Sequence, residues 1–169
     1  MAGTQEKIQL LQRIAHRLNE AHVEWALGAS MLLYFKGITS EFHDIDLMVA
    51  DRNAECVRTI LSEMGESCPS DSIPNSMYRT KNFMEFLIDS VEVDVMAGFA
   101  IVKDGKVYDC TLRKEQIVEK MPLGEEVVPL QSPLLWCKYY RLMGRPQKAD
   151  MIEKALSCGI PSQQSSQKA

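Results

Sequence analysis

Two aspartates interrupt an otherwise apolar stretch of the chain, near the end of the segment that runs from Trp25 to Val49. Asp44 and Asp46 flank Ile45, and three further apolar residues follow directly. Carboxylates are costly to place in such a strand unless something compensates their charge. A divalent cation is the simplest compensation, so the segment favours a fold in which one strand carries a metal-binding pair of acids.

A turn of small residues precedes this acid pair. Gly28, Ala29 and Ser30 separate an apolar run at 23–27 from a predicted helix at 31–35. A glycine lets the backbone approach a ligand closely, and the N–H groups at the start of a helix favour phosphate. The chain has no Gly-Lys-Ser or Gly-Lys-Thr sequence, so the turn is not a Walker phosphate loop. A phosphate-binding turn beside metal-binding acids indicates phosphoryl or nucleotidyl transfer.

A third aspartate lies in the sequence VEVDV at 91–95. Alternate side chains share one face of a strand, so Asp44 and Asp46 share a face, and Asp94 would join them if the two strands are neighbours. Three converging carboxylates repel one another strongly without a cation. We therefore expect these aspartates to hold two Mg²⁺ ions, with Mn²⁺ as the alternative metal. Glu85 is a further acid that we expect at the rim of the site.

The order of the expected elements is that of a mixed α/β domain. Apolar spacing predicts helices at 4–21, 31–35, 113–120, 132–143 and 146–157, with one more after Asp51, and strands at 23–27 and 43–49. Asp89-Ser90 and Asp104-Gly105 predict the turns of two hairpins, and 66–76 is expected to be a loop. The expected fold is a small mixed β-sheet backed by helices on one face, followed by C-terminal helices.

Composition is ordinary for a soluble globular protein, with 46% hydrophobic and 25% charged residues in a chain of 169. We expect one domain over 1–159 and a disordered polar tail over 160–169. A net charge of −4 gives no sign of polyanion binding, and five scattered cysteines without a Cys-x-x-Cys pair argue against disulfides or structural zinc. No segment is typical of a signal peptide or a membrane span, so a cytoplasmic location is expected.

The motifs together resemble the polymerase-β-like nucleotidyltransferase superfamily. Its pattern is Gly-(Gly/Ala)-Ser, then Asp-x-Asp on a strand, then a later strand aspartate, and the matching residues are Gly28, Ser30, Asp44, Asp46 and Asp94. The segment 132–156 also resembles the C-terminal part of small stand-alone members. These include the abortive-infection toxin type and the lincosamide and aminoglycoside nucleotidyltransferases.

The resemblance implies a nucleotidyltransferase fold and a role for each matching residue. Asp44 and Asp46 would hold the metals, and Asp94 would be the third ligand or the base that takes a proton from the acceptor hydroxyl. The implied nucleotide contacts are Gly28, Ala29, Ser30, Lys138, Arg145 and Asp150. The chain departs from the pattern in having Ala29 where a second glycine is commoner, and in lacking an arginine over 38–43.

The expected activity is metal-dependent transfer of a nucleoside monophosphate from an NTP, with ATP as the expected donor, and release of pyrophosphate. The acceptor would be a hydroxyl or amine on a small molecule, an RNA or a protein. A partner subunit or a homodimer could complete the site. Two alternatives stay open: a catalytically silent nucleotide- or partner-binding module of the same fold, and a structural protein whose acids are ordinary surface charge.

Overall fold

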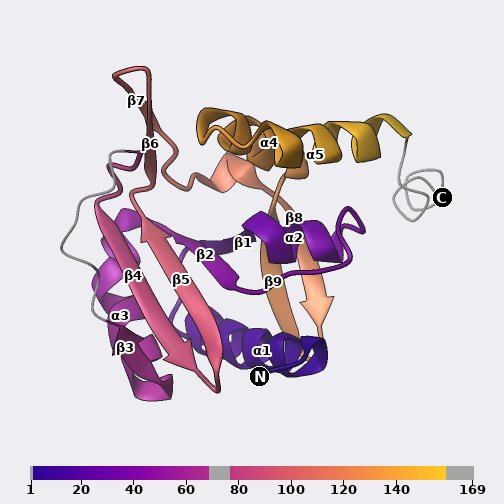
Figure 1. The fold of residues 1–169 in the computed structure, drawn as a ribbon. Helices are drawn as coiled ribbons and strands as arrows, with labels where there is room; N and C mark the ends of the chain where they lie inside the picture. The colour runs from indigo at the N-terminus through magenta and orange to yellow at the C-terminus, as the bar shows by residue number, and fades with distance from the viewer. Residues whose placement is uncertain (1, 69–76, 159–169) are drawn as a thin grey trace.

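The computed structural model describes residues 2–68 and 77–158. Its centre is a seven-stranded mixed sheet in the order β3-β4-β5-β2-β1-β9-β8, and a separate two-stranded hairpin, β6-β7, projects from it (Figure 1). The fold class expected from the sequence is confirmed. Within the described ranges, no helix has both the length and the apolar character needed to cross a membrane.

The first half of the chain alternates helices and strands. Its elements are α1 (Thr4–Glu20), β1 (Trp25–Gly28), α2 (Ala29–Phe35), β2 (Ile45–Val49), a 3-10 turn (Asp51–Asn53), α3 (Ala54–Met64) and β3 (Glu66–Cys68). The second half begins with hairpins and closes with two helices. Its elements are β4 (Asn82–Ile88), β5 (Val91–Ala97), β6 (Ala100–Lys103), β7 (Lys106–Asp109), a 3-10 turn (Lys114–Gln116), β8 (Ile117–Leu123), β9 (Glu126–Gln131), α4 (Pro133–Leu142) and α5 (Pro146–Cys158).

Strands that are distant in sequence meet at the middle of the sheet. β2 pairs parallel with β5 and antiparallel with β1, and β1 pairs parallel with β9. β4-β5 and β8-β9 are antiparallel hairpins. The first hairpin turns at Asp89 and Ser90, which have φ values of 50° and 65°, as a two-residue hairpin turn with positive φ at both positions requires.

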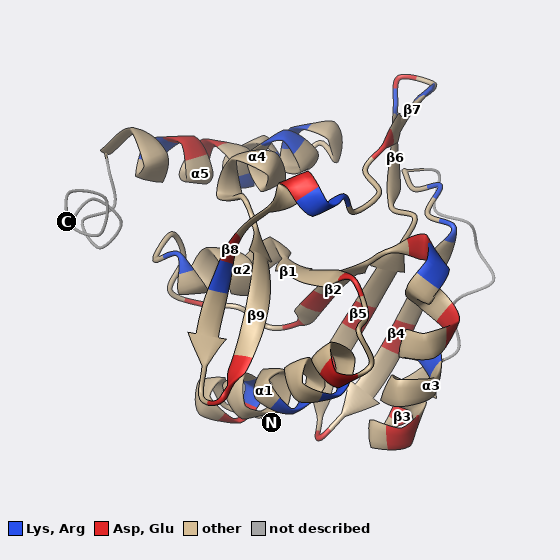
Figure 2. Cartoon of the chain, turned by 180° about the vertical axis from the view of Figure 1, so that it is seen from behind, with Lys and Arg blue, Asp and Glu red and all other residues tan. Residues whose placement is uncertain are grey.

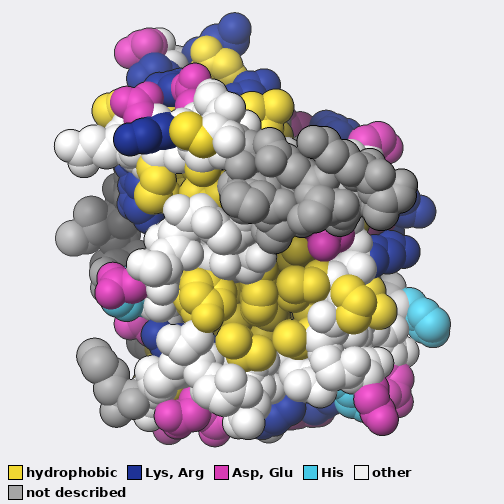
Figure 3. Space-filling model, turned by 90° about the vertical axis from the view of Figure 1, so that its right-hand side faces the viewer, with side chains coloured by type: hydrophobic (Ala, Val, Ile, Leu, Met, Phe, Trp, Pro, Cys, Tyr) yellow, Lys and Arg dark blue, Asp and Glu magenta, His cyan; other side chains and the backbone are white. Residues whose placement is uncertain are grey.

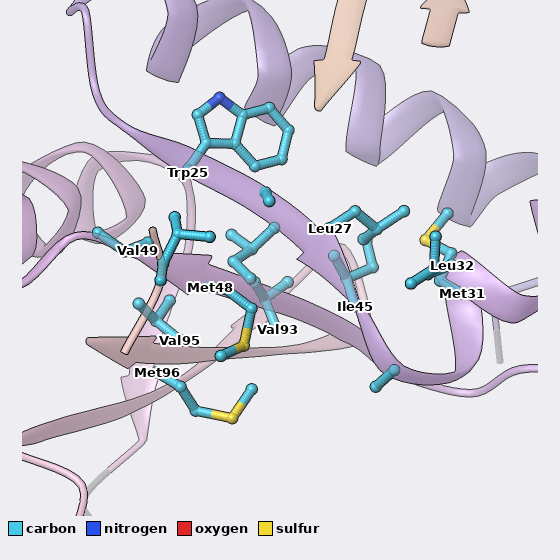
Figure 4. Close-up of a cluster of buried hydrophobic side chains, with 14 of the residues drawn as sticks. Trp25, Leu27, Met31, Leu32, Ile45, Met48, Val49, Val93, Val95 and Met96 are labelled. Atoms are coloured by element: carbon cyan, nitrogen blue, oxygen red, sulfur yellow. The ribbon is translucent and has the colours of Figure 1, made fainter. Parts of the chain in front are cut away.

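Helices lie on both faces of the sheet rather than on one. The indole N–H of Trp25 donates to Asn19 in α1, whereas Gly28, three residues further along the same strand, packs against Trp136 in α4. Because side chains alternate along a strand, α1 and α4 lie on opposite faces. The buried apolar side chains of β1, β2 and β5 fill the space between these layers, including Leu27, Ile45, Met48, Val93 and Val95 (Figure 4).

Two expectations about individual segments are also wrong. Residues 113–120 do not form a helix: a 3-10 turn over Lys114–Gln116 leads into strand β8. Residues 66–68, expected in a loop, form the short edge strand β3. The rest of that expected loop, at 69–76, and the expected tail at 160–169 lie outside the described residues. The expected hairpins and the two C-terminal helices are confirmed.

Apolar side chains also reach the surface. Figure 3 shows them gathered near the middle of the face seen from the right of Figure 1, with most charged side chains toward its borders. In the described ranges, the most exposed large apolar residues are Leu134, at 63%, and Val118, at 61%. Exposed apolar areas of this kind are common where proteins bind ligands or partners.

Candidate functional site

Acidic side chains form a straight row across the sheet. Asp46 on β2 is the register partner of Asp94 on β5, which in turn pairs with Glu85 on β4. On the other side, Asp46 pairs with Gly28 at the end of β1. Directly paired residues point to the same face, and neighbouring strands are about 5 Å apart. The row therefore places a glycine turn and three acids on one face, with β2, β5 and β4 each carrying acidic residues (Figure 2).

This face forms the floor of a cleft of about 1060 Å³. Ala29 and Ser30 line one end, Asp44, Asp46 and Asp94 lie in the floor, and Tyr78, Phe83 and Glu85 line the β4 end. The wall opposite the floor comes from α4, α5 and the turn between them, and its residues are Trp136, Tyr140, Met143, Arg145, Gln147, Lys148 and Met151. The cleft is large enough for a nucleotide together with part of a second molecule.

The cleft destabilises the charged form of its carboxylates. Burial, and then the neighbouring charges of Asp94 and Asp44, raise the pKa of Asp46 to about 8. Burial, and then the charges of Asp44 and Glu85, raise the pKa of Asp94 to about 7. Ionising these carboxylates together is therefore unfavourable without a cation, and a cation bound at the floor of the cleft would favour their charged forms.

Two cations face these acids from the opposite wall. Arg145 directly precedes α5 and Lys148 lies on its first turn, and both line the cleft. Their positive charges lower the pKa of Asp46, against the larger effect of burial. Lys148 also lies over the Tyr140 ring, with its Nζ atom 5.1 Å from the ring centroid. The cleft thus has an acidic floor and a basic wall, an arrangement that suits a phosphate chain bound through a divalent cation.

The turn at the end of β1 is tightly packed and strained. A Cβ atom added to Gly28 would come within 2.6 Å of the Trp136 ring, so only glycine fits there. The next residue, Ala29, has a φ of 55°, which is unfavourable for a residue with a side chain. Ser30, the next residue, lines the cleft.

The structure brings six of the nine site residues predicted from the sequence to the cleft itself: Ala29, Ser30, Asp44, Asp46, Asp94 and Arg145. Gly28 supports the cleft from beneath Trp136. Lys138 and Asp150 lie elsewhere. Lys138 lines a second groove, on the outer side of α4, and exposed Asp150 pairs with Arg141 at 3.1 Å.

Sequence reasoning missed Lys148 and the aromatic wall. Lys148 follows Arg145 by three residues, a spacing that puts two side chains on the same side of a helix, so this signal was present in the sequence. Trp136 and Tyr140 are four residues apart on α4 and share its inner side for the same reason. Lys138, two residues after Trp136, lies on the opposite side of α4 and lines the second groove.

The donor set on the cleft floor suits a hard divalent cation such as Mg²⁺, which prefers carboxylate oxygens. Across residues 2–68 and 77–158, however, no group of three or more His, Cys, Asp or Glu side chains is already arranged to hold a metal ion. Metal binding would therefore require the carboxylates to turn toward a common point. Asp46 and Asp94 can do so because they are direct neighbours on paired strands.

Comparison with known proteins indicates a family. A sequence model described as aminoglycoside-2″-adenylyltransferase matches residues 10–155. The structure resembles that of TM1012 from Thermotoga maritima, itself only proposed to be a nucleotidyltransferase, with 24% identity and a TM-score of 0.72 over 92% of this chain and 96% of that one. The resemblance to nucleotidyltransferases in the sequence motifs is confirmed.

Two antibiotic-modifying enzymes share the fold at lower identity. ANT(2″)-Ia, solved in complex with adenylyl-2″-tobramycin, is 13% identical with a TM-score of 0.59, over 89% of each chain. The lincosamide antibiotic adenylyltransferase LnuA, solved with lincomycin bound, is 13% identical with a TM-score of 0.56, over 87% of this chain and 97% of its own. A comparison with functionally curated proteins found no match.

Proposed function

Because the chain belongs to the aminoglycoside-2″-adenylyltransferase family, we propose that it transfers a nucleoside monophosphate from an NTP to a hydroxyl group of an acceptor. The observation that carries the proposal is the row from Gly28 through Asp46 to Asp94, which forms one side of a cleft whose other side holds Arg145 and Lys148. We expect ATP as the donor, in keeping with the adenylyl group in the family's name.

The row gives the substrates an order along the cleft. Gly28 and Ser30 lie at the β1 end, so the triphosphate would bind there, between the turn and the two cations on the α5 side. Asp94 lies one strand further from the turn than Asp46, so the acceptor hydroxyl would approach from the β4 side. Bound Mg²⁺, held by Asp44 and Asp46 with Asp94, would offset the negative charge of the phosphates and the carboxylates.

In the proposed reaction, the acceptor oxygen forms a bond to the α-phosphorus of the NTP. The bond from that phosphorus to the oxygen leading to the β-phosphate breaks, and pyrophosphate leaves with the electron pair. Asp94 orients the acceptor hydroxyl and takes its proton. Arg145 and Lys148 stabilise the negative charge on the phosphates, and positioning of both substrates in one cleft supplies the rest of the catalysis.

A small molecule is the acceptor class that the cleft favours. Its volume of about 1060 Å³ exceeds that of a site for a single drug-sized ligand. Net charge is −4, which does not favour a broad RNA-binding surface. ANT(2″)-Ia was solved with adenylyl-2″-tobramycin and LnuA with lincomycin, so an aminoglycoside and a lincosamide are the first acceptors to test.

Pyrophosphate release tests the proposal. The protein is incubated with each NTP, Mg²⁺ and, in turn, tobramycin, lincomycin or bulk tRNA, and we expect release only when NTP, Mg²⁺ and a suitable acceptor are all present. Asp94→Asn should abolish release, whereas Asp104→Asn, a matched change in an exposed hairpin turn that tolerates asparagine, should not.

Thermal stability in the same mixtures separates the alternatives. Binding must stabilise the folded protein by mass action. Stabilisation by NTP and Mg²⁺ without pyrophosphate release from any acceptor would favour a catalytically silent binding module. No effect of NTP and Mg²⁺ on either measurement would contradict the proposal and favour a structural role for the acids.

A further inference from the structure

Gln131 is the only polar or charged residue that is fully buried within the described ranges, with an exposed fraction of 0%. Its side-chain oxygen accepts a hydrogen bond from the Trp136 indole nitrogen at 2.8 Å, and its side-chain nitrogen donates to Gln116 at 3.1 Å. The same Gln116 oxygen accepts from the backbone N–H of Arg113 at 3.2 Å. The chain of bonds therefore fixes the orientation of the Trp136 ring from behind.

The Trp136 ring lies directly on the turn at the end of β1. Three of its atoms lie between 2.6 and 2.8 Å from the position that a Cβ on Gly28 would occupy. Gln131 is also a neighbour of this turn. Leu130, the residue before Gln131, pairs in parallel with Leu27, the residue before Gly28. Gly28, Gln131 and the indole thus form one packed unit at the β1 end of the cleft.

This unit adjoins a strained backbone. Ala29 has a φ of 55°, and a residue with a Cβ atom keeps such a conformation only where the surrounding structure enforces it. The backbone on one side of Ala29 is held by pairing of Gly28 with Asp46. On the cleft side, Trp136 covers the turn, and Gln131 is the side chain that holds Trp136 in place.

We propose that Gln131 is a positioning residue for the nucleotide: by fixing the Trp136 ring against Gly28, it holds the strained turn at Ala29 in the geometry that contacts the triphosphate. This rests on the proposed function, in which the turn is part of the NTP site. A purely structural role, in which Gln131 only satisfies the Trp136 N–H, makes a different prediction. In that purely structural role, the effect of replacing Gln131 does not depend on the backbone strain at Ala29.

The linkage is measured by combining Gln131→Leu with Ala29→Gly and titrating each variant with ATP and Mg²⁺ in a calorimeter. Gln131→Leu alone should weaken ATP binding at least fivefold. Glycine tolerates positive φ, so in the Ala29→Gly background the same change should cost less than twofold. Equal losses in both backgrounds, or unchanged affinity in Gln131→Leu, would overturn the proposal.

Two further variants separate positioning from general destabilisation. Ile14→Val makes a small cavity on the buried side of α1, on the opposite face of the sheet from Trp136, and should lower the melting temperature while leaving ATP affinity unchanged. Trp136→Phe removes the N–H that donates a hydrogen bond to Gln131. In the Trp136→Phe background, Gln131→Leu should therefore cause no further loss of ATP affinity. A further loss of the same size would mean that Gln131 acts by another route.

A nucleotide-free measurement keeps this proposal distinct from the proposed function. The chain has two tryptophans, so Trp25→Phe leaves Trp136 as the single tryptophan, which is excited selectively at wavelengths where the five tyrosines do not absorb. In that background, Gln131→Leu should shift the Trp136 emission and increase its quenching by acrylamide. If the wild-type protein binds no NTP, the proposed function fails. Unchanged emission and quenching would instead overturn the positioning role, whether or not NTP binds.

Discussion

Replacing Asp46 by asparagine should make the metal-free protein more stable while removing its function. In the folded protein, burial and the charges of Asp94 and Asp44 raise the pKa of Asp46 to about 8. In the unfolded chain the same group titrates at about 3.9. Between these values the folded state holds a proton that the unfolded state releases, so stability falls as pH rises from about 4 to about 8 and stays reduced above that.

The size of the effect follows from the shift. Each pKa unit corresponds to about 1.4 kcal/mol, so a rise from 3.8 to about 8 sets a ceiling of about 6 kcal/mol. The cleft is open to water and Asp46 is partly exposed in it, so hydration relieves much of this cost. We expect Asp46→Asn to gain about 2–3 kcal/mol at pH 8.5, or about 5–10 °C in melting temperature.

Differential scanning calorimetry with EDTA at pH 8.5 and at pH 4.5 measures the gain. It should be large at the higher pH and close to zero at the lower one. Asp104→Asn removes one exposed carboxylate and should change little at either pH. Addition of Mg²⁺ at pH 8.5 should raise the melting temperature of the wild type but not that of Asp46→Asn. A variant less stable than wild type at pH 8.5, or an equal gain at both pH values, would refute the reasoning.

Three other predictions concern the turn and the basic wall. Lys148→Ala and Arg145→Ala should each weaken ATP binding about tenfold because a charge near the phosphates is lost, whereas Lys138→Ala in the second groove should not, and calorimetric titration distinguishes them. Gly28→Ala should lower the free energy of unfolding by about 1–3 kcal/mol through overlap with the Trp136 ring, as denaturant unfolding would show. Ala29→Gly should raise unfolding free energy by about 1 kcal/mol by relieving the positive φ, and an unchanged or lower value would contradict that strain.

The face that carries each acid was predictable because strand periodicity alone decides it. Asp44, Asp46 and Asp94 sit at positions whose alternation puts them on one face, and the assumption that their strands are neighbours is confirmed by the pairing of Asp46 with Asp94. The hairpin turn at Asp104-Gly105 was equally accessible, because few residue pairs favour positive φ at both positions. Both features depend on residues that are close together in the sequence.

Features that depend on tertiary packing were not predictable in the same way. Residues 113–120 are mostly good helix formers, but pairing with β9 makes 117–120 part of strand β8. The family resemblance implies Lys138 as a nucleotide contact, yet the face of α4 that carries Trp136 and Tyr140 turns toward the cleft and leaves Lys138 in the second groove. The rotation of a helix about its axis depends on which side it buries, and the family motif does not specify which side of α4 is buried.

Transfer of label from NTP to an acceptor tests the central claim most directly. Wild-type protein and Asp46→Asn are each incubated with α-³²P-labelled ATP, Mg²⁺ and an extract of small molecules, RNA and protein, and the labelled products are separated by size and chemistry. The proposed nucleotidyl transfer predicts a discrete labelled acceptor with the wild type and none with Asp46→Asn. Absence of any labelled acceptor with each of the four NTPs, or equal labelling by both proteins, would contradict the claim.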